Sequence, residues 1–209
     1  MKSFKHLLVF SILFFMSANI LAQTTVMIGP RVTGNYNIYN QKGSTLSWNG
    51  IGVGVGAVVD ASFSKHIGLM VHLNAFDMRN FSTSLTTNNV VEEESQSLSY
   101  ITLEPMFKTE FSGFFMVAGP SVGIKLNSSG EYTRSQTGAT PQVSADNWDT
   151  KSIRFDIAVG TGYTFKLSNE IGLGTDFMAQ IPLTSTYNFI GVSNSIFTLK
   201  LGVSLKFKI

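Results

Sequence analysis

Few side chains in this sequence have the types and the spacing that catalysis requires. Histidine is the usual general base, and after residue 22 only His66 and His72 occur. His66 lies in a short polar turn. His72 lies in an alternating segment, where antiparallel pairing about residues 64–66 places it near Gly56 and away from Asp60. No Ser-His-acid arrangement follows, so we expect no catalytic residues and no enzyme.

The sequence also lacks the usual side chains for binding metals and cofactors. It has no cysteine, which excludes disulfides, thiolate metal sites, a cysteine nucleophile and a lipid-modified N-terminal cysteine. With so few histidines, a transition-metal site is not expected either. The acidic run Glu92–Glu94 could bind a divalent cation, or it could be a solvated loop tip that contacts cations loosely. We expect no cofactor and no metal.

Four glycines spaced by two lie on one face of a single segment: Gly50, Gly52, Gly54 and Gly56. Their spacing is superficially like that of a phosphate-binding loop. That motif also needs a Gly-Lys-Ser/Thr sequence and a following helix, and both are missing. We interpret the glycines as space left for large neighbours such as Arg31, Tyr100 or Met70.

Charged side chains occur regularly on the polar face of segments in which polar and apolar residues alternate. They are Arg31, Asp60, Glu104, Lys108, Lys125, Arg154, Asp156, Asp176, Lys200 and Lys206. Buried charges are tolerated only when they are paired and hydrogen-bonded. If the segments close into a barrel, these residues are predicted to form a lumenal ion-pair network that fills it. The alternative is a path for ions or solutes.

The C-terminal segment shows what kind of element carries these charges. From Ile196 to Ile209 the residues alternate without a break, with Leu201 on the apolar face and Lys200 on the polar face. This period of two predicts a strand, and one fully apolar face is typical of a transmembrane β-strand. Seven earlier segments alternate similarly: 26–38, 51–63, 67–76, 98–111, 114–126, 153–165 and 171–181. Together they predict an all-β fold, an eight-stranded antiparallel up-and-down transmembrane β-barrel.

The connections between these segments alternate between short and long. Short connections follow the second, fourth and sixth segments, whereas long polar ones cover 39–50, 78–97, 127–151 and 182–195. This alternation is typical of outer-membrane barrels with short periplasmic turns and longer exterior loops, and it places both ends of the barrel domain at the turn end. The longest loop contains Tyr132, Arg134 and Trp148, which are the types that dominate protein interfaces. We expect these three residues to be the loop contacts.

Aromatic residues gather near both ends of the predicted strands, as membrane interfaces favour. Those near the turn end are Phe63, Phe107, Phe111, Phe114, Phe165 and Phe207. Those near the loop end are Tyr36, Phe76, Phe155, Tyr187, Phe189 and Phe197. The alternative is that they form the core of a soluble β-sandwich.

The N-terminus has the features of an export signal. Lys2 and Lys5 precede an apolar run from Leu7 to Met16, and Ala22 is a plausible cleavage point. The alternative is an uncleaved membrane anchor. We expect residues 1–22 to be a signal peptide and residues 23–209 to form the barrel domain. Without Lys2 and Lys5 the chain has thirteen basic and thirteen acidic side chains, so it has no electrostatic footprint for nucleic acid.

Several stretches resemble the PorT-type outer-membrane β-barrel family, a group of small barrels that carry an outer membrane protein beta-barrel domain. They are the export signal ending at residues 21–23 and the strand-like segments 100–108, 118–123 and 156–163. The resemblance covers the whole mature chain, and it implies an outer-membrane barrel. It permits a role in a protein-secretion or envelope-assembly machine.

The sequence therefore predicts a monomeric barrel in the cell outer membrane with a filled polar lumen. Its expected partners are outer-membrane lipid and an envelope or extracellular protein bound through the loops. Two alternatives remain. The first is a barrel component of a secretion or assembly machine. The second is an exported soluble binder like a lipocalin, in which the apolar face would point inward.

Overall fold

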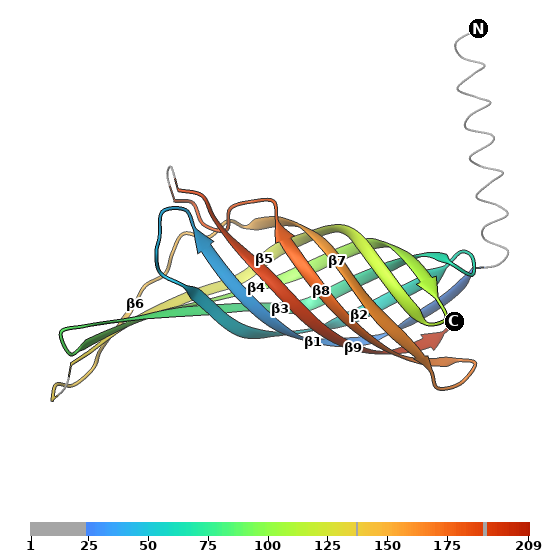
Figure 1. Cartoon of the computed structure of the whole chain (residues 1–209), viewed down its shortest axis with the longest axis horizontal. Coiled ribbons are helices and arrows are strands. Elements are labelled where there is room, and N and C mark those ends of the chain that lie inside the picture. Colours follow the sequence, from blue (N-terminus) through green and yellow to red (C-terminus); the bar gives the residue numbers. More distant parts are fainter. Residues whose placement is uncertain (1–23, 137, 190–191) are drawn as a thin grey trace, which may run out of the picture.

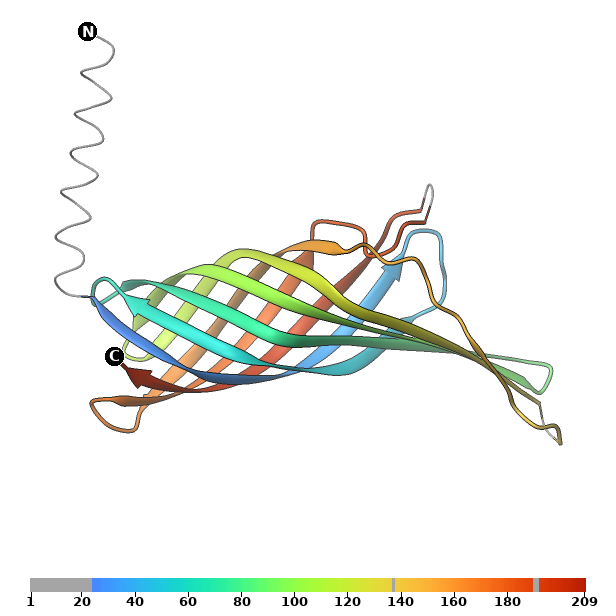
Figure 2. The same ribbon diagram turned by 180° about the vertical axis from the view of Figure 1, so that it is seen from behind.

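The computed structural model describes residues 24–136, 138–189 and 192–209. The expected signal peptide, residues 1–22, lies outside the described residues. Figures 1 and 2 show a tilted ring of strands, from one end of which a narrow sheet projects. The strands are β1 (Thr25–Gln41), β2 (Trp48–Ser62), β3 (Ile67–Thr87), β4 (Val90–Phe111), β5 (Phe114–Gln136), β6 (Gln142–Ala145), β7 (Ile153–Lys166), β8 (Ile171–Pro182) and β9 (Asn194–Lys208).

Eight of these strands close into an antiparallel barrel. Each of β1 to β4 pairs with the next strand, β5 pairs with β7, and β7, β8 and β9 follow in order. The ring closes through β1 and β9, where Val32 lies opposite Val203. The ninth strand, β6, pairs with the far half of β5 and lies outside the ring. The predicted eight-stranded up-and-down barrel is confirmed.

The two faces of the strands point as the alternation predicts. In β9, Lys200 is completely buried in the lumen, whereas the next residue, Leu201, is 66% exposed on the outside. Val32 and Ile51 are likewise exposed on the outer surface, and Arg31 is buried inside. The lipocalin-like alternative is therefore wrong, because it required the apolar face to point inward. No helix in the described part of the chain is long and apolar enough to cross a membrane.

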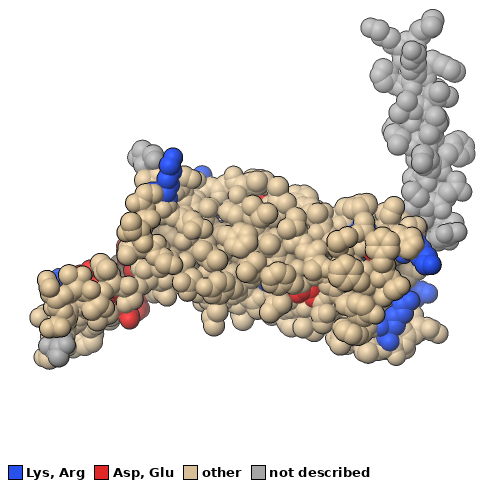
Figure 3. Space-filling model, viewed as in Figure 1, with Lys and Arg blue, Asp and Glu red and all other residues tan. Residues whose placement is uncertain are grey.

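The outer surface carries an apolar belt that ends well below the tips of the strands. Figure 3 shows the middle of the barrel largely free of charged side chains, with lysines and arginines toward its ends. On β3 and β4 the outward residues change from Met78 and Ile101 to polar ones. These are Asn80, Ser82, Ser95 and Ser97. Everything on these strands beyond Ser97 therefore projects past the apolar belt.

The largest difference from the sequence prediction is in the long connections. Most of the expected loop 78–97 is an extension of the β3–β4 hairpin, which turns at Asn88 and Asn89 with φ of 50° and 64°. Asparagine tolerates this left-handed region better than most residues. The expected loop 127–151 begins as the far half of β5 and includes β6. Both faces of these segments are solvated, so the apolar alternation that marks a half-buried strand is missing.

The glycine stripe in β2 allows the backbone of β3 to approach closely. A Cβ atom at Gly52 would lie 2.1 Å from the backbone oxygen of Met78, and one at Gly56 would lie 2.1 Å from that of Leu73. The register between the two strands shifts beside Val55. The space is therefore occupied at these positions by the backbone of β3, and not by large lumenal side chains as expected. A glycine in a strand permits such a close approach of two backbones.

Candidate functional site

The side chains that point into the lumen form layers of different chemistry from one end to the other. β4 contributes an inward residue to each of these layers. Leu98 and Tyr100 belong to an aromatic cluster at the loop end, Glu104 to a charged layer, and Met106 to an apolar cluster. Lys108 belongs to a second charged group at the turn end. An eight-stranded barrel has an interior about wide enough for side chains, and the side chains of these layers are buried inside it.

The central charged layer is organised around Lys200. Its Nζ donates to Asp77 Oδ2 and to Glu104 Oε1, both at 2.9 Å. All three side chains are completely buried. Glu104 also accepts hydrogen bonds from Gln180 and, at 3.3 Å, contacts His72 Nδ1. The charge of Lys200 is thus shared between two strands on the far side of the lumen.

Asp77 and Arg79 are central to this layer, although the sequence prediction ended the third strand just before them. Arg79 Nη2 lies 2.7 Å from Asp77 Oδ2, and the guanidinium also donates to Thr198 and Gln180. The β3–β4 register shifts between Asn74 and Asp77. This bulge reverses the facing of β3, so that simple alternation places both residues on the wrong side.

Two arginines complete the charged layer. Arg31 forms a bidentate ion pair with Asp176, with its Nε 3.2 Å from Oδ2. Arg154 donates from Nε to both carboxylate oxygens of Asp156, at 2.9 and 2.8 Å, and from Nη2 to the backbone oxygen of Ile196 at 2.5 Å. In this layer four basic side chains thus face four acidic ones, which offsets the cost of burying them.

Lys125 lies apart from the charged layer in which the sequence prediction placed it. It is half-buried in the middle of β5, and its Nζ donates to the backbone oxygen of Thr150 at 2.9 Å. None of the salt bridges in the described ranges involves Lys125. On β5 it lies two residues closer to the loop end than Gly123, which is opposite Arg154. Lys125 holds a loop in place instead.

The loop end of the lumen is closed by an aromatic cluster. Its buried members are Tyr39, Trp48, Phe81, Leu98, Tyr100, Tyr187 and Ile196, with Trp148 and Phe189 packed against them. Tyr39 stacks on Phe81 with ring centroids 4.9 Å apart. The placement of Tyr187 and Phe189 in a membrane-interface belt is therefore wrong. Their loop folds inward because burial in the lumen removes both rings from water.

Residues 146–151, which we call the mouth cover, cross the loop end above this cluster. At one end of the cover, Gln96 Nε2 donates to Asp146 O at 2.8 Å. At the other end, Thr150 forms a β-bridge with Tyr187. Between them Trp148 is half-buried, with its ring centroid 4.8 Å from that of Tyr187. The expected role of Trp148 as an exposed loop contact is thus revised, because its ring is held in the cluster.

Tyr132 and Arg134 lie on the projecting part of β5. Arg134 is exposed, and its Nε lies 3.6 Å from Glu92 Oε1 on the neighbouring strand. Because Glu92–Glu94 form part of β4, Glu93 points to the opposite side of the sheet from its two neighbours. No group of three or more acidic or histidine side chains in the described ranges converges as a cation site.

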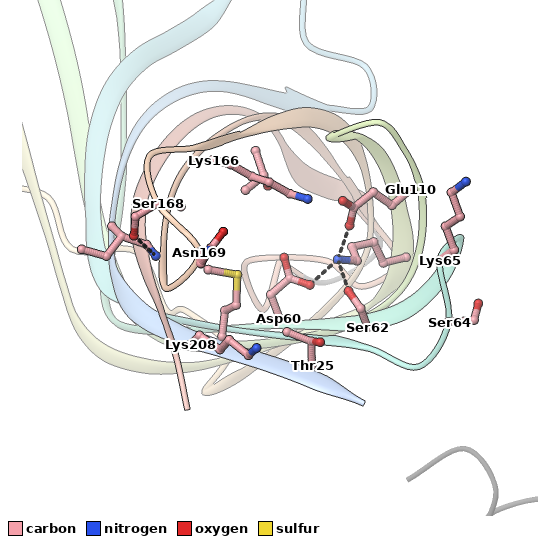
Figure 4. A pocket seen from close by; sticks show the side chains of 15 residues that line it. Thr25, Asp60, Ser62, Ser64, Lys65, Glu110, Lys166, Ser168, Asn169 and Lys208 are labelled. Atoms are coloured by element: carbon pink, nitrogen blue, oxygen red, sulfur yellow. Dashed lines mark hydrogen bonds and ion pairs between the residues drawn. The ribbon is translucent and has the colours of Figure 1, made fainter. Parts of the chain in front are cut away.

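At the turn end the lumen opens into a vestibule of about 420 Å³. At its base Asp60 accepts hydrogen bonds from Lys108 and, at 2.7 Å, from Lys206. Lys108 also donates to Glu110 at 2.7 Å and to Ser62 at 3.1 Å. Figure 4 looks into this vestibule and shows the contacts of Lys108 with Asp60, Ser62 and Glu110 as dashed lines.

Comparisons with known proteins cover most of the chain. A family model described as "Outer membrane protein beta-barrel domain" matches residues 21–188. A comparison with curated proteins finds no match.

Among solved structures, three outer-membrane proteins are similar in part. CarO2 of Acinetobacter baumannii has 12% identity and a TM-score of 0.47, covering 88% of this chain and 99% of that one. The attachment invasion locus protein Ail of Yersinia pestis has 12% identity and a TM-score of 0.41, covering 87% and 98%. The outer membrane protease OmpT of Escherichia coli has 7% identity and a TM-score of 0.39, covering 89% and 96%.

The family match extends over well more than half of the chain and includes most of the barrel strands. It agrees with the closed antiparallel ring and the outward apolar belt. The chain belongs to the family of proteins with an outer membrane protein beta-barrel domain, and it is located in the outer membrane.

Proposed function

We propose that this protein is a monomeric, non-conducting barrel that acts as a platform for protein contacts at the cell surface. The observation that carries the proposal is the sheet formed by β3, β4, β5 and β6, which continues beyond the apolar belt (Figure 2). A barrel that only anchored itself in lipid would not need strands of this length. Exterior segments on a rigid scaffold are a common place for binding residues.

Two features support the non-conducting part of the proposal. The side chains of the charged layer form ion pairs with one another, as Lys200 does with Asp77 and Glu104. Above it, the aromatic cluster and the mouth cover close the loop end. An ion would have to separate buried ion pairs and pass a ring of apolar side chains, and both steps are costly.

The proposal includes no catalytic step. His72 is buried in the lumen, where its Nδ1 lies 3.3 Å from Glu104 Oε2. It is therefore far from the exterior surface that a large substrate could reach. His66 lies at the turn end, where its Nδ1 is 3.0 Å from the backbone oxygen of Glu110.

The contact surface that we propose is the projecting sheet, with Tyr132 and Arg134 on one side and Glu93 on the other. Its partner is an envelope or extracellular protein. Among the described residues, the last pair between β2 and β3 is Asn49 with Ser82, so the edge of β3 beyond Ser82 has no paired strand on that side. The mixed charge and the hydroxyl-rich faces favour a polar protein surface over lipid.

We also propose the narrower PorT-type grouping within the family. The stretches that carry this resemblance, residues 100–108, 118–123 and 156–163, form parts of β4, β5 and β7. If the grouping holds, the partner belongs to a secretion or envelope-assembly machine. The identity of the captured protein decides between this role and a general surface contact.

Site-specific photo-crosslinking in intact cells tests the proposal. A photoreactive residue at Tyr132 should form a covalent adduct with a discrete protein, whereas the same residue at Phe177, on the apolar belt, should not. Purified barrels in planar bilayers should show no steady conductance. A stable open channel would refute the filled lumen, and the absence of protein adducts along the whole projecting sheet would refute the contact role.

A further inference from the structure

The vestibule at the turn end has a charge pattern that its own residues do not neutralise. Its base is balanced, because Lys108 and Lys206 share Asp60, and Lys108 also pairs with Glu110. The rim adds three lysines: Lys65, Lys166 and Lys208. None of the salt bridges in the described ranges uses these rim lysines. The opening is therefore electropositive.

The carboxylates at the base are already occupied, which excludes a cation as the natural occupant. Asp60 accepts from two ammonium groups, and Glu110 accepts from one. A cation entering the vestibule would have to displace Lys108 or Lys206, and both are almost completely buried. An anion would meet unpaired ammonium groups instead.

The rest of the lining supplies neutral hydrogen-bonding groups. Hydroxyl and amide side chains surround the opening: Thr25, Ser62, Ser64, Thr164, Ser168 and Asn169. In Figure 4 the side chain of Lys166 extends over the opening, and that of Lys208 lies at its edge near Thr25. Ammonium groups combined with hydroxyl donors suit an oxyanion with several acceptor oxygens.

We propose that this vestibule is a binding site for a phosphate group carried by a small soluble solute of the periplasm. Lys166 and Lys208 provide the charge, and the hydroxyl groups orient the oxygens. The short turns of outer-membrane barrels face the periplasm, so the site is open to that compartment. A lipid headgroup offers the same chemistry, but the vestibule lies inside the ring, where the continuous sheet separates it from the bilayer.

The site is independent of the proposed contact role, because it lies at the opposite end of the barrel from the projecting sheet. Failure of one proposal leaves the other unaffected. A loss of phosphate binding would not change crosslinking at Tyr132, and the reverse also holds.

Titration calorimetry on the folded protein in maltoside micelles, with inorganic phosphate as the probe, tests the site. We expect saturable binding that weakens as salt is added. The double variant Lys166→Gln, Lys208→Gln should bind phosphate at least about tenfold more weakly, which is about 1.4 kcal/mol, because it removes both charges that hold the oxyanion. Lys42→Gln, which removes an exposed lysine at the loop end, is the control and should leave the affinity unchanged. Equal affinity in all three proteins, or no saturable binding, would overturn the proposal.

A vesicle experiment separates the two sources of phosphate. The protein is reconstituted in phosphatidylcholine vesicles and in vesicles that contain phosphatidylglycerol, and phosphate binding is measured in both. Similar affinities support a soluble ligand. If phosphatidylglycerol alone abolishes phosphate binding in the unmodified protein, a lipid headgroup occupies the vestibule and the soluble-ligand proposal is wrong.

Discussion

Trp48 and Trp148 meet edge to face, with ring centroids 5.4 Å apart. Trp48 begins β2, whereas Trp148 belongs to the mouth cover. They are the only two tryptophans in the chain, so their contact reports directly on whether the cover is docked. Coupling between two indole rings at this distance should give a near-ultraviolet circular dichroism signal that disappears when the cover moves away.

The first prediction concerns the docking of the mouth cover. Trp148→Ala removes the ring that packs against Tyr39, Trp48 and Tyr187, so residues 146–151 should become sensitive to limited proteolysis while the barrel stays folded. Trp48→Phe is the control, because it abolishes the indole coupling but keeps an aromatic ring in the cluster. Equal protease resistance of both variants would show that Trp148 does not hold the cover.

The second prediction is a pH dependence of the same docking. Glu94 lies beyond the apolar belt, and one of its carboxylate oxygens is buried without a hydrogen-bond partner. Burial, and then the neighbouring carboxyl of Asp146, raise the pKa of Glu94 to about 7. Since the docked state keeps its proton more tightly than the undocked state, docking is strongest in acid and weakens as the pH rises from the ordinary carboxyl range to about 7.

The tryptophan signal should therefore decrease as the pH is raised from the ordinary carboxyl range to about 7. Gln96 and Trp148 also face Glu94, and the ring systems of Tyr39, Tyr132 and Tyr187 lie nearby. Glu94→Gln removes the titrating group, so the signal should become independent of pH in this range. Glu92→Gln, which alters the exposed pair with Arg134, should leave the transition in place.

The third prediction compares two adjacent residues of β9 that face opposite ways. Lys200→Met leaves Asp77 and Glu104 buried without their shared cation, and it should lower the free energy of unfolding by about 3–5 kcal/mol. Leu201→Arg places a charge in the apolar belt and should cost about 2–4 kcal/mol near the bilayer midplane. Urea unfolding in lipid vesicles measures both. A cost below 1 kcal/mol for Lys200→Met, as expected for a solvated lysine, would contradict the pairing.

The fourth prediction concerns export. Cleavage after Ala22 should give a mature protein that begins at Gln23, because the apolar run before it is too short for a membrane-spanning helix. Mass spectrometry of the outer-membrane fraction measures the N-terminus. Retention of Met1 would indicate an uncleaved anchor.

The sequence predicts the barrel well because each strand has one face in lipid and one in the lumen. Leu201 and Lys200 are assigned correctly by alternation alone, and so is the burial of Arg31 and Asp176. The prediction fails where alternation is interrupted. The bulge before Asp77 reverses the facing of β3, and nothing in the local residue types marks its position.

The aromatic cluster at the loop end could not be predicted from the sequence either. Trp148 looks like an exposed interface residue because it lies in a long polar stretch, and its contacts with Tyr39 and Tyr187 come from distant strands and loops. The projecting β3–β4 hairpin lacks an apolar face, so its many serines and threonines favour the prediction of a loop. The Asn88–Asn89 turn was the one local signal that could have identified it.

The ion pairs of the lumen connect the first strands of the chain to the last. Arg31 of β1 pairs with Asp176 of β8, and Asp60 of β2 pairs with Lys206 of β9. Lys200, also of β9, pairs with Asp77 and Glu104 of β3 and β4. Before β8 and β9 join the sheet, these charged residues of β1 to β4 lack those ion-pair partners. Unpaired charges strongly disfavour a dry interior. Closure of the β1–β9 seam and drying of the lumen must then occur together, which makes the last two strands a checkpoint for cooperative assembly.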